Sequence, residues 1–67
     1  MTRAEKMKSA LNHGTRDWTD LLIEADGIGE AYEQDFENET TYFELPDGSV
    51  AVFNGLGQSI TAYGCKE

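Results

Sequence analysis

Basic residues are scarce in this chain, and none lies between Asp17 and Asp47. This stretch of 31 residues carries eleven acids, and the formal net charge of the chain is −8. Proteins that bind DNA, RNA or an anionic membrane need cationic side chains facing phosphate, so we expect no direct binding to nucleic acid or membrane. The same charge favours an electropositive protein or ribonucleoprotein partner, because opposite charges accelerate the encounter.

Cysteine and histidine are also scarce. Cys65 is the single cysteine, so no disulfide can form within the chain, and we expect a reducing, intracellular compartment. The apolar run Leu21–Ile23 is far too short to cross a bilayer. His13 is the single histidine, and it stands at the expected end of a helix, where histidine commonly bonds carbonyl groups. Because no nucleophile and base are paired, we expect no catalytic residues and no enzyme.

Oxygen ligands are plentiful, but their spacing does not predict a metal site. The window Asp26–Glu37 has an acid at the first and twelfth positions of a calcium loop. Ile28 takes the third position and Ala31 the sixth, where such loops need a ligand and a glycine. Zinc would need a pair of His or Cys residues that the chain lacks. We therefore expect no cofactor and no dedicated metal site.

The first third of the chain predicts two short helices. Thr2–Glu5 matches a capping box, which predicts a helix over residues 3–12 that stops at Gly14. Thr15 resembles a second N-cap, and the apolar spacing after it predicts a helix that ends near residue 25.

Residues 28–39 allow two interpretations. A helix would place Asp35 among the apolar residues and stack like charges four residues apart, which is unfavourable. In a strand, Tyr32, Gln34 and Phe36 alternate without exception with the acids at positions 33, 35, 37 and 39. We favour a strand over about residues 31–37, and in both interpretations the acids gather on one surface.

The last third predicts three strands of an antiparallel meander, Thr40–Leu45, Ser49–Asn54 and Gln58–Tyr63. The turns between them contain Asp47–Gly48 and Asn54–Gly57, which are typical hairpin residues.

We expect Val50 and Val52 to face the core beside Phe43. Ala51 and Phe53 would then face away from it. The expected fold is α+β, with two short N-terminal helices packed on a three- or four-stranded antiparallel sheet in a single domain.

The acids are the main candidate site. Carboxylates on alternate residues of a strand lie about 6.6 to 6.8 Å apart, so a row at Glu33, Asp35, Glu37 and Glu39 would resemble the regular charge of a nucleic-acid backbone. Tyr32 would serve as an apolar anchor among them. The predicted partner-binding residues are Asp17, Asp20, Glu24, Glu30, Tyr32, Glu33, Asp35, Glu37 and Glu39.

In size, acidity and mixed α/β composition the chain resembles the small acidic proteins that bacteriophages encode against host defence, in particular anti-CRISPR proteins. The region that carries most of the resemblance is WTDLLIEADGIGEAYEQDFENETTYFELPDGSVAVF, from Trp18 to Phe53. The resemblance implies a non-enzymatic inhibitor in the cytoplasm of a bacterial host. It would bind a CRISPR surveillance complex, of the type I Cascade-like class, by mimicking DNA on its basic surface.

The alternative is a small acidic adaptor or oligomerisation domain. Such a domain would bind a protein partner through an edge strand or an apolar patch, and the acids would serve solubility. Its association would be insensitive to salt, whereas binding by charge mimicry would weaken steeply as salt rises.

Overall fold

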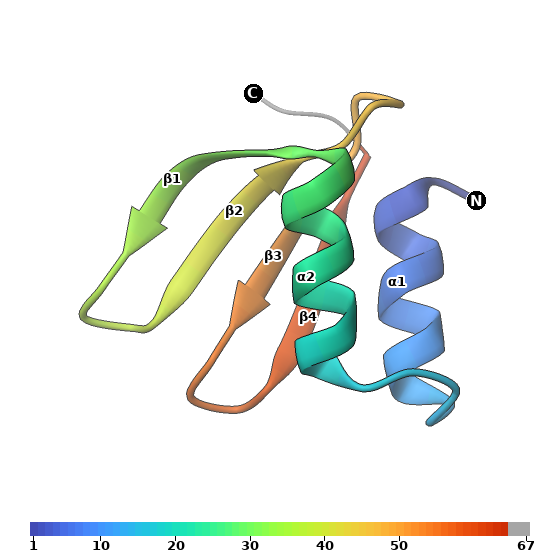
Figure 1. Cartoon of the computed structure of the whole chain (residues 1–67), viewed down its shortest axis with the longest axis horizontal. Helices are drawn as coiled ribbons and strands as arrows, with labels where there is room; N and C mark the ends of the chain where they lie inside the picture. The colour runs from blue at the N-terminus through green and yellow to red at the C-terminus, as the bar shows by residue number, and fades with distance from the viewer. Residues whose placement is uncertain (65–67) are drawn as a thin grey trace.

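The computed structural model describes residues 1–64, which form two helices and a four-stranded antiparallel sheet (Figure 1). This arrangement confirms the predicted α+β fold. Cys65 lies outside the described residues. The elements in chain order are α1 (Arg3–Asn12), α2 (Trp18–Ile28), β1 (Glu30–Asp35), β2 (Thr40–Glu44), β3 (Val50–Asn54) and β4 (Ser59–Tyr63).

Helix α1 follows the prediction at both ends. The Thr2 hydroxyl accepts from the Glu5 amide at 3.2 Å, and the Glu5 carboxylate accepts from the Thr2 amide at 2.9 Å, so the capping box is complete. The helix ends at Asn12, and Gly14 follows with φ of +72°, a left-handed conformation that glycine adopts without strain.

Helix α2 differs from the prediction at both ends. Its N-cap is Asp17 rather than Thr15, because the Thr15 amide donates to Ala10 O at 2.9 Å and so extends the end of α1. The helix continues past residue 25 to Ile28. It stops where Gly29 passes β2: a Cβ on Gly29 would lie 2.6 Å from the Glu44 carbonyl oxygen. A contact distant in sequence therefore sets this boundary.

The sheet is a meander in the order β1–β2–β3–β4. Strand β1 confirms the strand interpretation of residues 28–39, but it spans Glu30–Asp35 rather than residues 31–37, and residues 36–39 form a turn. The register of β1 against β2 shifts between Ala31 and Glu33, which marks a β-bulge.

The core lies between the helices and one face of the sheet. Ala51 and Phe53 face this core, and Val50 and Val52 face away from it, so the predicted faces of β3 were inverted. Phe43 faces the core as expected and is the neighbour of Ala51 across the sheet. Cross-strand neighbours share a face, so the register fixes the side on which β3 buries its residues. The buried core residues are Ala4, Met7, Leu21, Ala25, Phe43, Leu45, Ala51, Phe53 and Ile60.

Candidate interaction surface

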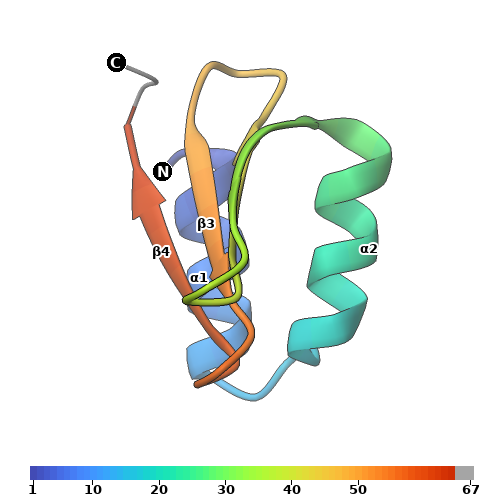
Figure 2. The ribbon, with the colours of Figure 1, turned by 90° about the vertical axis from the view of Figure 1, so that its left-hand side faces the viewer.

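Both helices pack on one face of the sheet, and within residues 1–64 neither covers the opposite face (Figure 2). We call this opposite side the open face. The register places Tyr42 beside Val52 and Tyr63 beside Val50 on it. Tyr32 joins them, since its ring centroid lies 6.0 Å from that of Tyr42. Antiparallel sheets commonly leave one face to solvent, but that face is then mostly polar rather than aromatic.

The open face has an apolar layer of its own. Val50 and Val52 are only 2% and 7% exposed, although no helix of the described chain covers them. Their cross-strand neighbours Tyr63 and Tyr42 are large enough to provide this cover. Burial raises the pKa of Tyr32, and the neighbouring charges of Glu33, Tyr42, Glu44 and Tyr63 raise it further, which places these groups together.

Three carboxylates border the tyrosines. Glu30 and Glu33 are exposed on β1, and within residues 1–64 their side chains form no hydrogen bond or ion pair. Glu30 lies directly opposite Glu44 of β2. Like charges on cross-strand neighbours generally destabilise a sheet. The structure therefore brings together three of the predicted site residues, Glu30, Tyr32 and Glu33.

The predicted row of four carboxylates is wrong beyond Asp35. Asp35 accepts from the amides of Glu37 and Asn38 and from Asn38 Nδ2 at 2.7 Å, so it stabilises the β1–β2 turn. These bonds, led by that from the Asn38 side chain, lower the pKa of Asp35. Glu37 and Glu39 lie in the turn, where Glu39 has φ of +51° and its backbone carbonyl oxygen accepts from the Gly55 amide at 2.8 Å. The regular spacing ends because the strand ends.

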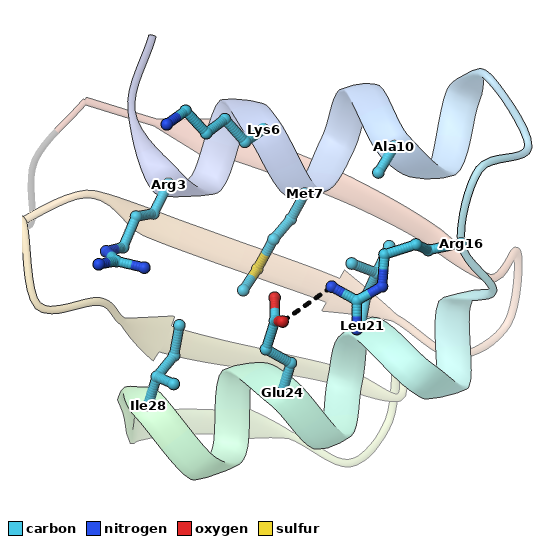
Figure 3. Close-up of a pocket in the computed structure, with 8 residues that line it drawn as sticks. All are labelled: Arg3, Lys6, Met7, Ala10, Arg16, Leu21, Glu24 and Ile28. Atoms are coloured by element: carbon cyan, nitrogen blue, oxygen red, sulfur yellow. Dashed lines mark hydrogen bonds and ion pairs between the residues drawn. The ribbon is translucent and has the colours of Figure 1, made fainter.

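The predicted acids of α2 belong to a different surface. Asp20 and Glu24 both pair with Arg16, at 2.9 and 2.8 Å. Figure 3 shows the pair with Glu24. Hydrogen bonds from Glu24 and then Asp20 raise the pKa of Arg16. These two carboxylates are therefore compensated by a cation that directly precedes the acidic stretch, which corrects their assignment as unopposed charge. Asp17 remains exposed at the N-cap and has no side-chain capping bond.

Positive charge gathers in the helical layer. A groove of about 120 Å³ separates α1 from α2 (Figure 3), with Arg3 and Lys6 among its lining residues on the α1 side. Arg16 and Glu24 line the groove from the other side, where their ion pair is formed. Among residues 1–64 the lysines and arginines thus lie in the helical part of the chain, and the strands and the turns between them contain acids but no lysine or arginine.

Sequence reasoning missed four residues of the exposed surface. Glu44 and Tyr63 belong to the open face but were not predicted as site residues, because the strand pairing that gathers them on this face is not visible in the sequence. Phe36 and Leu56 are 79% and 68% exposed at the β1–β2 and β3–β4 turns. These turns lie at the same end of the sheet (Figure 1). Large apolar residues next to turn residues were the available signal.

Within residues 1–64 no three His, Cys, Asp or Glu side chains gather closely enough to hold a metal ion. Neither described helix has the length and apolar character needed to cross a membrane. Comparison with protein-family models, with curated proteins and with solved structures finds no match for this chain.

Proposed function

We propose that this protein is a non-enzymatic inhibitor that occupies a basic nucleic-acid-binding surface of a host-defence complex, as its resemblance to anti-CRISPR proteins implies. The observation that carries the proposal is the charge of the sheet. Residues 30–64 contain seven acids and no lysine or arginine. Ordinary protein surfaces intersperse both signs, whereas a surface that replaces nucleic acid needs one sign alone.

Glu30 and Glu33 are the residues best placed to act. Both are exposed, and neither is engaged by a hydrogen bond or ion pair among residues 1–64, so a lysine or arginine groove can pair with them. Glu30 also lies directly opposite Glu44 of β2, so acids from two strands stand together on this surface, as pairing with a cationic groove requires. The site of action would be the bacterial cytoplasm, and a type I Cascade-like complex is the proposed target.

Inhibition of target binding by a purified type I surveillance complex tests the proposal. The complex and labelled target DNA are mixed with increasing protein, and bound DNA is followed by electrophoretic mobility shift. Wild-type protein should displace the DNA, and Glu33→Lys should lose most of this effect. Asp26→Lys, at an exposed position of α2, changes the net charge by the same amount and should still inhibit. If both variants lost inhibition equally, the effect would depend on net charge alone and not on a site at Glu33.

One observation favours the adaptor alternative. Strand β4 is an edge of the sheet, and its residues Ser59–Tyr63 include no charge, while the β1 edge is protected by its bulge and acids. If β4 paired with a second copy, light scattering at micromolar concentration would show a dimer whose mass does not change with salt. The inhibitor proposal expects a monomer in the same measurement.

A further inference from the structure

The open face carries more aromatic surface than charge mimicry requires. The tyrosine platform consists of Tyr32, Tyr42 and Tyr63, which are drawn from three strands. Tyr32 and Tyr63 remain 39% and 53% exposed, so much of each side chain is accessible to a partner. A solvated acidic face would need only polar side chains. An exposed aromatic platform instead offers flat rings on which a ligand can stack.

Carboxylates lie beside these rings. Glu33 pairs with Tyr42 across β1 and β2. Val50 lies between Glu44 on β2 and Tyr63 on β4, so a carboxylate and a tyrosine stand on either side of it. This combination suits a planar cation. An arginine guanidinium stacks on an aromatic ring and bonds a carboxylate through its edge, whereas a lysine ammonium is compact and strongly hydrated.

Aromatic side chains on a four-stranded antiparallel sheet can also stack the bases of RNA. Such a surface needs cations nearby to face the phosphates. Here Glu30, Glu33 and Glu44 border the platform, and residues 17–64 contain no lysine or arginine. The charge therefore selects a cationic protein segment over a nucleic acid.

We propose that the tyrosine platform is an arginine-binding surface, on which arginine side chains of a cationic protein partner stack while their guanidinium groups bond the exposed carboxylates of Glu30 and Glu33. The inference rests on the proposed function for the sign of the partner's charge. It adds that the partner's contact residues are arginines rather than lysines. Each stacked guanidinium should favour arginine by about two- to five-fold.

The test uses two unlabelled peptides of equal length, an oligoarginine and an oligolysine, titrated into the isotopically labelled protein and followed by NMR. The first readout is the ratio of the two affinities, and the second is the set of backbone amides that shift. Tyr32→Leu with Tyr63→Leu removes two rings but keeps apolar cover over Val50. Tyr32→Phe with Tyr63→Phe keeps the rings and serves as the matched control.

Oligoarginine should bind more tightly than oligolysine, and the shifts should map to β1–β4 on the open face. The ratio should fall towards one in the leucine variant and persist in the phenylalanine variant. The proposal would be overturned if the double leucine variant kept the affinity ratio of wild type. It would also be overturned if the amide shifts were confined to α2 or to the turns. Preferential binding of a short oligouridine would overturn it as well. If the leucine variant fails to fold, Tyr63→Leu alone gives the same comparison, because Tyr63 is the more exposed ring.

The two proposals fail in different ways. If Glu33→Lys abolishes inhibition of the surveillance complex but the peptide ratio does not depend on the tyrosines, charge mimicry stands and the arginine surface is wrong. If the ratio depends on the tyrosines but no surveillance complex is inhibited, the arginine surface stands and serves another cationic partner.

Discussion

Asp47 Oδ2 accepts from the backbone amide of Arg3 at 2.8 Å, across 44 positions of the sequence. The other oxygen of Asp47 accepts from the amide and hydroxyl of Ser49. Ser49 is fully buried, and its hydroxyl oxygen also accepts from the Ala4 amide at 3.3 Å. The β2–β3 turn thus satisfies two free amides in the first turn of α1, which no residue of the helix can do. This contact attaches the N-terminal helix to the sheet.

The first prediction concerns the pH dependence of this contact. The Ser49 hydroxyl, followed by the Arg3 amide, lowers the pKa of Asp47 from 3.8 to about 2. A lowered folded-state pKa contributes stability that is fully present above the unfolded value and is lost as pH falls through the folded value. Asp47→Asn should therefore lower Tm at neutral pH, and the difference from wild type should vanish as pH falls from about 3.8 towards 2.

Asp26→Asn is the control, because Asp26 is exposed on α2 and forms no hydrogen bond or ion pair with residues 1–64. It should change Tm little across the same pH range. Thermal melts followed by circular dichroism give both curves. A constant difference between Asp47→Asn and wild type down to pH 2 would show that the carboxylate charge does not stabilise the contact.

The second prediction compares two glycines at the end of α2. Gly29→Ala should destabilise the protein by about 1–3 kcal/mol, because its Cβ would lie 2.6 Å from Glu44 O and 2.8 Å from a Leu45 methyl. Gly27→Ala should stabilise it by about 0.5 kcal/mol, since Gly27 is helical with open space around it. Urea unfolding measures both free energies. Equal effects in the two variants would mean that the approach of β2 to Gly29 is not limiting.

The third prediction separates the two groups of acids. Glu24→Gln removes an ion pair with Arg16, so it should slightly lower Tm and leave inhibition of the surveillance complex intact. Glu30→Gln removes one of two like charges on cross-strand neighbours, so it should raise the free energy of unfolding by roughly 0.2–0.5 kcal/mol and weaken inhibition. Thermal melts test the opposite changes in stability, and the mobility-shift assay tests the difference in inhibition. Equal inhibition by both variants would contradict the assignment of the site to the sheet.

Local signals predicted what local interactions determine. Thr2, Glu5 and Gly14 define α1 because a capping box and a left-handed glycine act within one turn of chain. The end of α2 depends instead on the approach of β2 to Gly29, and the faces of β3 depend on its pairing with β2. Neither contact is visible in a window of neighbouring residues.

The same distinction applies to the candidate site. Glu30 shares a side with Glu33 only because of the β-bulge between Ala31 and Glu33, which the sequence did not indicate. The alternation of acids did predict that Glu33 and Asp35 share one side of a strand, and the register confirms this. It could not show that Asp35 is engaged by Asn38, nor that Tyr63 from the far end of the chain joins the same face. The pairing of Arg16 with Asp20 could have been predicted from the sequence, because residues four apart on a helix are neighbours.

The last prediction contrasts two phenylalanines. Phe53 is 1% exposed and contacts the rings of Trp18 and Phe43 at 5.9 and 5.4 Å between centroids, so Phe53→Ala should destabilise the fold by about 3–5 kcal/mol. Phe36 is 79% exposed beside the turn acids, so Phe36→Ser should change the free energy of unfolding by less than about 0.5 kcal/mol.

An exposed aromatic ring that adds nothing to stability fits a role in binding. Phe36→Ser should therefore weaken inhibition in the mobility-shift assay while the urea unfolding curve stays that of wild type. Leu56→Ser, at the adjacent turn, tests whether Phe36 and Leu56 act together. If the double variant inhibits no more weakly than either single variant, both side chains belong to one contact. Full inhibition by Phe36→Ser would restrict the interface to the open face and exclude the turns.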